Sequence, residues 1–323
     1  MSLPAPGFYD PDRVKELYLE RAPMVAEAAS EYRRQNKIQP SGRDRFRIAA
    51  FGVDCQVGFC LPGASLFVPG AVEDTQRTLA WLYANLDRIT ALHFSLDTHR
   101  VFQIFHPAWW NDKDGKHPTP FTTITCEDVR AGRWMPISHP RESLEYCKKL
   151  EQTGKYVLTI WPYHTLLGSA SHALVPALME AAIFHSVARF HQTHFETKGT
   201  HSLTENYSVL SPEVRELSGG PVGSFNTAFF KLLMEHDRIY VFGQAKSHCV
   251  LSTLKDIQHE ISASDPGLAD RVWILEDATS PVPPPPINPL PPELDFPKIA
   301  DRTFEEFKKA GMHVVKTTDP VVF

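Results

Sequence analysis

Short apolar runs alternate with longer amphipathic stretches along most of this chain. Runs such as residues 46–53 are typical of buried strands, and stretches such as 71–87 are typical of helices. The pattern predicts strands at 46–53, 89–96, 156–160, 193–198, 239–243, 271–276 and 313–317, and helices at 11–35, 71–87, 172–190, 224–236, 249–262 and 301–311. Because strands that alternate with helices form parallel sheets covered on both faces, we expect an α/β fold.

The composition is that of an ordinary globular protein. Hydrophobic residues make up 42% and charged residues 22% of the 323 residues, which excludes a wholly disordered chain. The net charge of −5 gives no electrostatic reason to bind nucleic acid or an anionic membrane. Neither a transmembrane run nor a signal peptide is expected. Five cysteines without metal-site spacing favour reduced thiols and a cytoplasmic location.

Two irregular segments interrupt the alternation. Residues 100–155 show no sustained period, and residues 280–297 contain nine prolines in eighteen residues. Polyproline favours a rigid surface crossover, with a PxxP ligand for a partner protein as the alternative. We therefore expect a helical extension at 1–45, one domain over 46–317 that includes both segments, and a tail at 318–323.

Polar side chains follow several of the predicted strands, where ligands bind in parallel sheets. Asp54 comes directly after a buried run, so its carboxylate must be paired, hydrogen-bonded or functional. Asp97 and His99 point the same way from the end of the next strand, and both are metal-ligand types. His106 and His164 follow further along. Each alone has a structural explanation, but their joint occurrence favours an active site.

Cys249 lies where a predicted strand gives way to a predicted helix. The positive end of the helix dipole lowers the pKa of a thiol placed there, and the thiolate is the nucleophilic form. An isolated cysteine at a helix start is otherwise inert packing. The carboxylates and histidines predicted at the same sheet edge favour a nucleophile.

Five segments, taken together and in this order, resemble the isochorismatase-like cysteine hydrolases, and within them the nicotinamidases. They are Val53-Asp-Cys-Gln-Val-Gly-Phe59 with Gly63 and Val68-Pro-Gly-Ala71, Asp97-Thr-His99, Trp161-Pro-Tyr-His164, Lys198-Gly-Thr and Gly243-Gln-Ala-Lys-Ser-His-Cys-Val250. The similarity covers residues 46–99 and 156–317. It implies a three-layer α-β-α sandwich around a mostly parallel, six-stranded sheet.

The resemblance implies a catalytic role for three of these positions. Cys249 would be the nucleophile, and Asp54 would take its proton and pass it to the leaving amine. Lys198 would lie beside both and favour the thiolate. The backbone N–H groups of Ala245 and Cys249 would form the oxyanion hole, beside a cis peptide bond between Gln244 and Ala245.

The resemblance also implies a metal cofactor and a ring-binding pocket. The metal would be divalent, zinc first and iron or manganese as alternatives, and it would contact the pyridine nitrogen of the substrate. Its ligands would be Asp97, His99 and His164, with His106 as a candidate fourth. Phe59 and Trp161 would stack against the substrate ring.

These roles imply hydrolysis of nicotinamide, or a related heteroaromatic amide, to the carboxylate and ammonia through a thioester. The chain departs from the nicotinamidase pattern at Thr165, Lys246 and Ser247, so another amide or an N-carbamoyl compound remains an alternative substrate. Residues 100–155, which we call the insertion, and the proline-rich segment at 280–297 leave a third alternative, a non-catalytic binding protein. A small-molecule amide is the expected partner, and the enzyme is expected to be a homo-oligomer.

Overall fold

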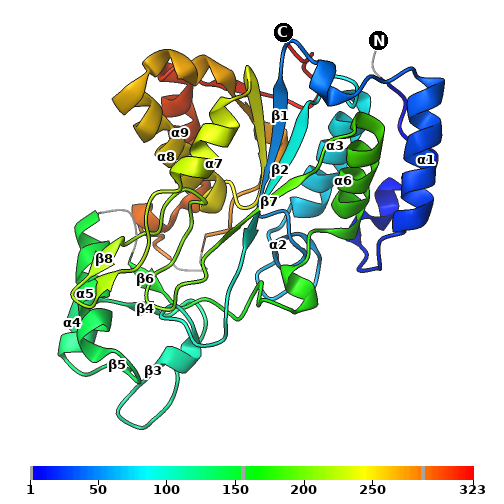
Figure 1. Ribbon diagram of the computed structural model, residues 1–323. Coiled ribbons are helices and arrows are strands. Elements are labelled where there is room, and N and C mark those ends of the chain that lie inside the picture. Colours follow the sequence, from blue (N-terminus) through cyan, green and yellow to red (C-terminus); the bar gives the residue numbers. More distant parts are fainter. Residues whose placement is uncertain (1–2, 154–156, 285–287) are drawn as a thin grey trace.

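A six-stranded sheet forms the centre of the computed structural model, which describes residues 3–153, 157–284 and 288–323. The strand order is β12-β11-β10-β1-β2-β7, and each neighbouring pair is parallel (Figure 1). The strands are β1 (Ile48–Val53), β2 (Ala91–Asp97), β7 (His194–Lys198), β10 (Arg238–Gly243), β11 (Val272–Leu275) and β12 (His313–Val315). The carboxyl ends of all six strands therefore meet at one edge.

The central strand β1 is buried at every position, as expected of a strand covered on both faces. Its Gly52 is required by close packing, because a Cβ atom there would lie 2.5 Å from the ring of Phe94 and 2.8 Å from that of Phe242. Those two rings pack with centroids 6.3 Å apart on the neighbouring strands β2 and β10. Larger residues would force the strands apart at the point where they approach the site.

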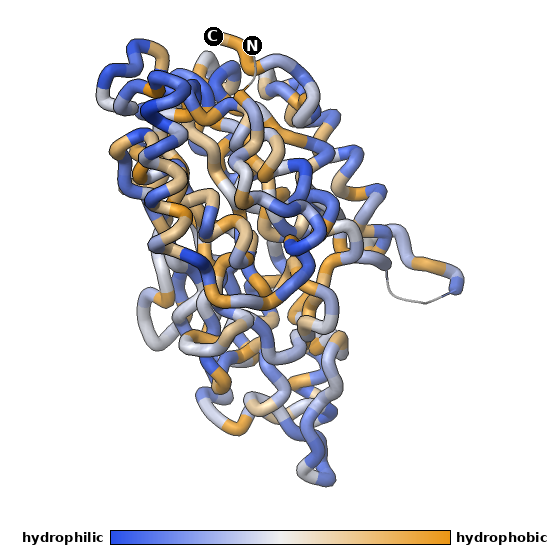
Figure 2. Tube along the Cα trace, turned by 90° about the vertical axis from the view of Figure 1, so that its right-hand side faces the viewer, coloured by the Kyte–Doolittle hydropathy of each residue, from blue (hydrophilic) through white to orange (hydrophobic). Residues whose placement is uncertain are grey.

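Helices cover both faces of the sheet (Figure 1). One layer contains α1 (Ala22–Gln35), α3 (Ala71–Ala84) and α6 (Pro176–Arg189), and the other contains α7 (Thr227–Met234), α8 (Cys249–Ser264) and α9 (Phe296–Lys309). Each layer has its own apolar cluster against the sheet. Figure 2 shows apolar residues along the strands and polar residues on the outward turns. The predicted three-layer α/β fold is confirmed.

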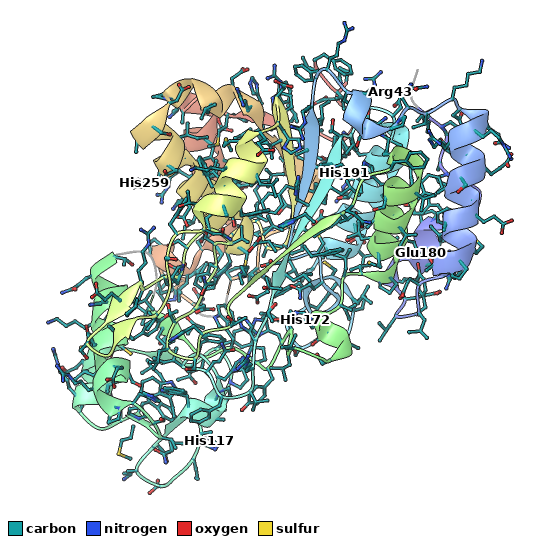
Figure 3. All side chains as sticks on the ribbon, in the orientation of Figure 1. Arg43, His117, His172, Glu180, His191 and His259 are labelled. Carbon is teal, nitrogen blue, oxygen red and sulfur yellow. The ribbon has the colours of Figure 1, made fainter. Side chains whose placement is uncertain are left out.

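The N-terminal helix predicted at 11–35 is divided in the structure. Pro11–Lys15 forms a short 3-10 helix, and α1 begins only at Ala22, with Pro23 in its first turn. Proline is tolerated there because the first N–H groups of a helix have no intrahelical partner. Arg21 then forms two contacts of 2.9 Å with Glu180 on α6 (Figure 3), which fastens this segment to the domain.

Residues 100–155 hold more regular structure than their sequence indicates. They form α4 (Cys126–Arg130), α5 (Pro140–Thr153), a pair of short strands β3 (Trp110–Asn111) and β5 (Met135–Pro136), and β4 (Thr123–Ile124). In α5, buried Ser143, Tyr146, Cys147 and Leu150 follow the i, i+3, i+4, i+7 pattern of a helix with one covered face. The charged residues between them hid this pattern.

The strand predicted at 156–160 is wrong in its placement. Residue 156 lies outside the described residues, and the rest contains only β6 (Leu158–Thr159), which pairs with β4 rather than joining the central sheet. A short apolar run does not reveal its partner, because the partner is set by tertiary packing. His164 therefore reaches the site from the loop that follows β6, and not from a strand of the central sheet.

The remaining elements are short. They are α2 (Val57–Cys60), β8 (Glu216–Leu217), β9 (Gly220–Pro221), and 3-10 helices at Ser41–Arg43, Pro107–Trp109, Ala170–His172, Pro266–Arg271, Glu276–Ala278 and Pro292–Leu294. The proline-rich segment runs without regular structure from Ser280 until the last of these, although residues 285–287 lie outside the description. Within the described ranges, no helix combines the length and apolarity needed to cross a bilayer.

His93 is a buried side chain of β2 surrounded by other histidines. Its ring lies 5.4 Å from that of His236 and 5.8 Å from that of His194. Neither of its ring nitrogens has a hydrogen-bond partner among the described residues. Burial, reinforced by the neighbouring histidines, lowers the pKa of His93 from 6.5 to about 3. The ring is therefore neutral in the folded protein at neutral pH.

We expect His93 to make the fold sensitive to acid. The unfolded chain takes up this proton below pH 6.5 and the folded chain only near pH 3, so stability is full above pH 6.5 and falls as the pH drops. Between pH 7 and pH 4 the variant His93→Leu should lose about 3 kcal/mol less unfolding free energy than the wild type. Urea unfolding at both pH values measures this difference, and equal losses in the two proteins would contradict it.

Candidate active site

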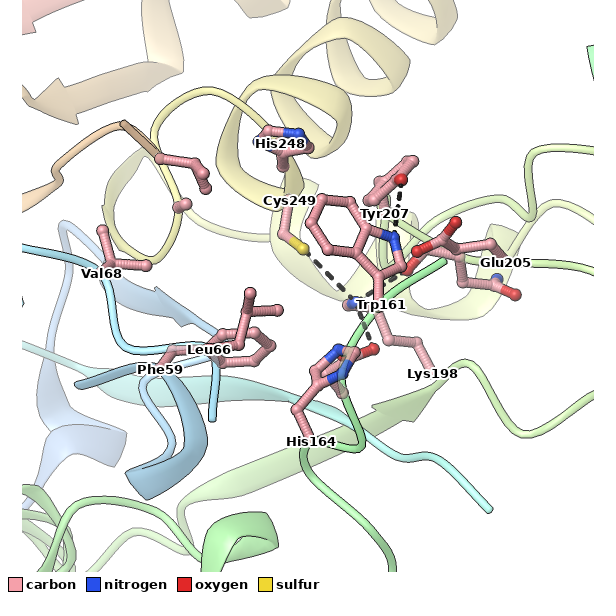
Figure 4. Close-up of a pocket in the computed structure, with 14 residues that line it drawn as sticks. Phe59, Leu66, Val68, Trp161, His164, Lys198, Glu205, Tyr207, His248 and Cys249 are labelled. Carbon is pink, nitrogen blue, oxygen red and sulfur yellow. Dashed lines mark hydrogen bonds and ion pairs between the residues drawn. The ribbon is translucent and has the colours of Figure 1, made fainter. Parts of the chain in front are cut away.

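Three side chains predicted to act together meet at the carboxyl edge of the sheet. The Nζ atom of Lys198, at the end of β7, lies 3.0 Å from Oδ2 of Asp54. It also lies 3.7 Å from Sγ of Cys249 (Figure 4). Asp54 directly follows β1, and Cys249 is the first residue of α8, after β10. All three side chains are buried. The ammonium group of Lys198 is therefore in contact with both a thiol and a carboxyl group.

Asp54 is held by the neighbouring strand β2. The Oγ atom of Ser95 donates to Oδ1 of Asp54 at 2.6 Å and accepts from its backbone N–H at 3.0 Å. Burial raises the pKa of Asp54, and the positive charge of Lys198 opposes this shift only in part. A raised pKa suits a group that must take up and return a proton near neutral pH.

Lys198 keeps its charge despite its burial. Its Nζ donates to Oδ1 of Asp97 and to the backbone oxygen of Asn206, both at 2.7 Å. Although burial acts to lower it, the carboxylates of Asp54 and Asp97 hold the pKa of Lys198 well above its usual range. The ammonium group of Lys198 therefore links the carboxyl group of Asp54 to that of Asp97, one of the candidate metal ligands.

The Cys249 thiol differs from the sequence expectation of a lowered pKa. Burial raises the pKa of this thiol well above its usual range, although Lys198 acts to lower it. The negative charge of Asp54 also acts to raise the pKa of the thiol. Burial therefore favours the protonated thiol over the thiolate at this position.

The predicted metal ligands Asp97, His99 and His164 form one buried group, with ligand atoms all within 4.8 Å of one another. Nε2 of His99 lies 2.7 Å and Nε2 of His164 lies 3.4 Å from Oδ2 of Asp97. Although burial favours its neutral form, His99 and Lys198 hold the pKa of Asp97 well below its usual range. Two imidazoles and a carboxylate are a donor set that zinc and other divalent metals accept.

Hydrogen bonds to backbone oxygens fix the tautomers of these rings. Nδ1 of His99 lies 3.2 Å from the oxygen of Gly199, and Nδ1 of His164 lies 2.7 Å from that of Pro162. Carbonyl oxygens only accept, so each Nδ1 carries the hydrogen and each Nε2 directs a lone pair at Asp97. Burial lowers the pKa of His99, although Asp97 acts to raise it, and so favours the neutral ring whose Nε2 can bind a metal. Two such imidazole nitrogens beside the carboxylate of Asp97 therefore fit a divalent metal.

His106 stands close to this group but is not part of it. Its ring centroid lies 5.8 Å from that of His99 and 6.1 Å from that of His164. Nδ1 faces the oxygen of Arg100 at 3.0 Å, and the buried Nε2 has no partner among the residues described. The Nδ1 of His106 carries the hydrogen, as in His99 and His164, and its Nε2 has no partner among the residues described. His106 therefore stays a candidate fourth ligand, but its ring would have to move toward the other three.

Gln56 and Thr165 support the metal group, and neither was assigned a role from the sequence. The side-chain oxygen of Gln56 accepts from the backbone N–H of Asp97 at 2.7 Å, and its Nε2 donates to the backbone oxygen of Asp97 at 2.9 Å. The hydroxyl of Thr165 donates to Oδ2 of Asp97 at 3.3 Å. Thr165, one of the departures from the nicotinamidase pattern, therefore contacts the carboxylate of Asp97 directly.

The pocket around these groups is lined by fourteen residues from distant parts of the chain (Figure 4). They are Phe59, Leu66, Val68, Asp97, Trp161, His164, Lys198, Glu205, Asn206, Tyr207, Ala245, His248, Cys249 and Val282. Phe59 and Trp161 are thus placed in the lining, as predicted. Glu205, Asn206 and Tyr207 were missed, although their position within ten residues of the end of a strand was a usable signal.

The peptide bond between Gln244 and Ala245 is cis, as expected from the resemblance. Ala245 lines the pocket beside Cys249, whose N–H is the first of α8 and has no partner within that helix. These are the two backbone groups that the sequence analysis assigned to an oxyanion hole.

The other two departures from the nicotinamidase pattern contact the C-terminal part of the chain. They are Lys246 and Ser247. Nζ of Lys246 lies 2.6 Å from Asp301 on α9, and its backbone N–H donates to Ser280 at 2.9 Å. The hydroxyl of Ser247 accepts from the backbone N–H of Val282 at 3.0 Å. These two residues therefore hold the start of the proline-rich segment against the loop that precedes Cys249.

Comparisons with known proteins identify the fold. Neither the protein-family models nor the curated proteins contain a match to this chain. Among solved structures it is similar to a nicotinamidase/pyrazinamidase from Acinetobacter baumannii, with 18% identity, a TM-score of 0.53, and coverage of 86% of this chain and 99% of that one. The yeast nicotinamidase Pnc1p is similar with 20% identity, a TM-score of 0.52, and coverage of 83% and 99%. The chain therefore has the fold of these nicotinamidases.

Proposed function

We propose that this protein is a metal-dependent cysteine amidohydrolase that converts nicotinamide, or a related heteroaromatic amide, to the carboxylate and ammonia. The observation that carries the proposal is the contact of Lys198 with both Cys249 and Asp54, next to the buried group of candidate metal ligands. The similarity to nicotinamidase structures supports this substrate class. The aromatic lining by Phe59 and Trp161 suits a flat ring.

The first half of the proposed reaction forms a thioester. Asp54 takes the thiol proton, and Sγ of Cys249 attacks the amide carbon. The N–H groups of Ala245 and Cys249 donate to the oxyanion that develops, and the ammonium group of Lys198 balances the negative charge that the proton transfer moves from Asp54 to Sγ of Cys249. When the carbon–nitrogen bond breaks, Asp54 gives its proton to the leaving amine, which departs as ammonia.

The second half releases the acid. Asp54 takes a proton from a water molecule, which attacks the thioester carbon and displaces the sulfur. Asp54 then returns that proton to Sγ of Cys249, so the site regains its starting state. A divalent metal held by Asp97, His99 and His164 would supply a Lewis-acid contact for the ring nitrogen of the substrate.

Ammonia release from a panel of amides, with zinc, iron(II) or manganese supplied, tests this function. We expect turnover of nicotinamide and pyrazinamide to exceed that of benzamide, which has the same shape without the ring nitrogen. Faster turnover of an N-carbamoyl or aliphatic amide would assign the same chemistry to another substrate. Absence of ammonia release from every member, with metal bound, would contradict the proposal and favour a non-catalytic protein.

The proposal includes a cytoplasmic, homo-oligomeric enzyme. All five cysteines lie in the described part of the chain, and all are buried and unpaired. Reduced thiols are typical of proteins kept in a reducing compartment.

A further inference from the structure

The proline-rich segment at 280–297 has no role in the proposed reaction, yet its start lies at the pocket. Val282 is one of the residues that line the pocket, together with Cys249. Its half-buried side chain also packs against the apolar cluster that contains Phe59 and Val68. A segment that carries none of the motifs shared with nicotinamidases therefore forms part of the pocket wall.

Three hydrogen bonds hold the start of this segment against the loop that precedes the nucleophile. The backbone N–H of Val282 donates to the hydroxyl oxygen of Ser247 at 3.0 Å. The backbone oxygen of Ser280 accepts from the N–H of Lys246 at 2.9 Å, and the N–H of Ser280 donates to the side-chain oxygen of Gln244 at 3.4 Å. The residue between the two anchored positions is a proline, whose ring fixes one backbone dihedral. The backbone that carries the Val282 side chain is therefore held in place.

A buried carboxylate of α3 holds the same wall from the other side. The side-chain Nε2 of Gln244 donates to Oδ2 of Asp74 at 2.8 Å, and Asp74 is only 2% exposed. Oδ1 of Asp74 accepts from Arg77 at 2.8 Å, and Arg77 also donates to the backbone oxygen of Asp277, three residues before Ser280. The start of the proline-rich segment is therefore fastened to helix α3 as well as to the loop that precedes the nucleophile.

The hydroxyl of Ser247 joins Val282 to the aromatic part of the lining. Besides accepting from the N–H of Val282, Oγ of Ser247 lies 2.9 Å from Nδ1 of His248, which also lines the pocket. The ring of His248 packs edge-on against that of Trp161, with the centroids 5.7 Å apart. The departure from the nicotinamidase pattern at Ser247 therefore supplies the atom that anchors Val282.

The pocket lining combines charged groups with purely apolar side chains. Lys198 and Asp97 form an ion pair, whereas Leu66, Val68 and Val282 offer only carbon atoms. An apolar wall accepts the C–H edge of a ring, but an added methyl group needs space of its own. Because hydrogen bonds hold the backbone of Val282, this part of the wall cannot readily move aside.

We propose that Val282 is a specificity-determining residue, which bounds the pocket beside Cys249 and limits the size of the substituents that a ring substrate can carry. The substrate class that fits is a small heteroaromatic amide without a substituent on the ring edge next to Val282. This choice of substrate rests on the proposed function, whereas the limit on access to Cys249 does not.

The first experiment needs no substrate. The rates at which iodoacetamide and the larger N-phenylmaleimide label Cys249 are measured by mass spectrometry of its peptide, in the wild type, Val282→Ala and Val282→Phe. We expect Val282→Ala to raise the ratio of the maleimide rate to the iodoacetamide rate about tenfold, and Val282→Phe to lower it. Val322→Ala, at an exposed valine outside the lining, should leave the ratio unchanged. An unchanged ratio in Val282→Ala, or no labelling of that variant by the larger reagent, would overturn the proposal.

The second experiment compares kcat/KM for nicotinamide with that for nicotinamides methylated at each free ring carbon in turn. Val282→Ala should raise the relative kcat/KM of at least one methylated amide about tenfold, because the fit of one methyl group in an apolar pocket has an effect of that order. Ser247→Ala, which removes the acceptor of the Val282 N–H, should change the same ratio in the same direction, and Ser247→Thr, which keeps the hydroxyl, should not. Ratios in Val282→Ala that stay at the wild-type value for every methylated amide would contradict the proposal. Absence of turnover in the wild type would instead contradict the proposed function, and the labelling of Cys249 would then decide on Val282.

Discussion

Replacing Cys249 by alanine should lower kcat for nicotinamide hydrolysis by about 10⁴-fold or more. In the proposed reaction the thioester forms on Sγ of this residue, and Lys198, 3.7 Å from that sulfur, and Asp54 would act through it. Continuous measurement of ammonia release at saturating nicotinamide checks the result. A Cys249→Ala protein that retains more than a hundredth of the wild-type kcat would contradict a covalent mechanism at this position.

Cys147 provides the matched control for this substitution. It is a buried cysteine of α5, in the insertion and outside the pocket lining. Cys147→Ala removes the same sulfur atom and should lower the midpoint of thermal unfolding while kcat stays within about threefold of the wild type. Circular dichroism of both variants separates a loss of folding from a loss of the nucleophile.

Removal of the metal should have the second largest effect. The three candidate ligands bring two imidazole nitrogens and a carboxylate oxygen within 4.8 Å of one another, an arrangement that suits a divalent cation. We expect dialysis against a chelator to reduce nicotinamide turnover about 10³-fold, and a stoichiometric divalent metal to restore it. Metal content determined by mass spectrometry should follow the activity through removal and restoration.

His164→Ala tests the same site without disturbing the contact of Lys198 with Asp97. It should lose both bound metal and activity, whereas His259→Ala, on an exposed position of α8 (Figure 3), should lose neither. Full activity of metal-free protein, or unchanged metal content in His164→Ala, would show that this group does not bind the metal the enzyme uses. In that case a direct contact between Lys198 and the substrate would have to take the place of the proposed metal contact.

Much of the catalytic group could be predicted from the sequence because sheet topology determines it. Asp54 directly follows β1, Lys198 ends β7 and Cys249 opens the helix after β10, and these strands deliver their ends to the same edge. The strand period and the polar residue that follows a strand are local signals, and they indicated Asp54 and Cys249. Lys198 was expected only from the resemblance to a known family.

The rest of the site depends on tertiary contacts that leave no local signal. Burial raises the pKa of the Cys249 thiol, whereas its position at a helix start had predicted a lowered pKa, and burial is a property of the packed molecule rather than of the neighbours in sequence. Glu205 and Tyr207 lie in a loop, where position is set by α5 of the insertion. That helix itself was missed because its apolar face is narrow and its sequence is charged.

Detection of an acyl group on Cys249 tests the central claim most directly. The enzyme is mixed with nicotinamide and metal, quenched in acid during turnover, and digested for mass spectrometry of the peptide that contains Cys249. The account predicts a fraction of this peptide heavier by one nicotinoyl group, and none in the Cys249→Ala protein. Ammonia release without any acyl group on Cys249, at a quench time shorter than one turnover, would contradict it.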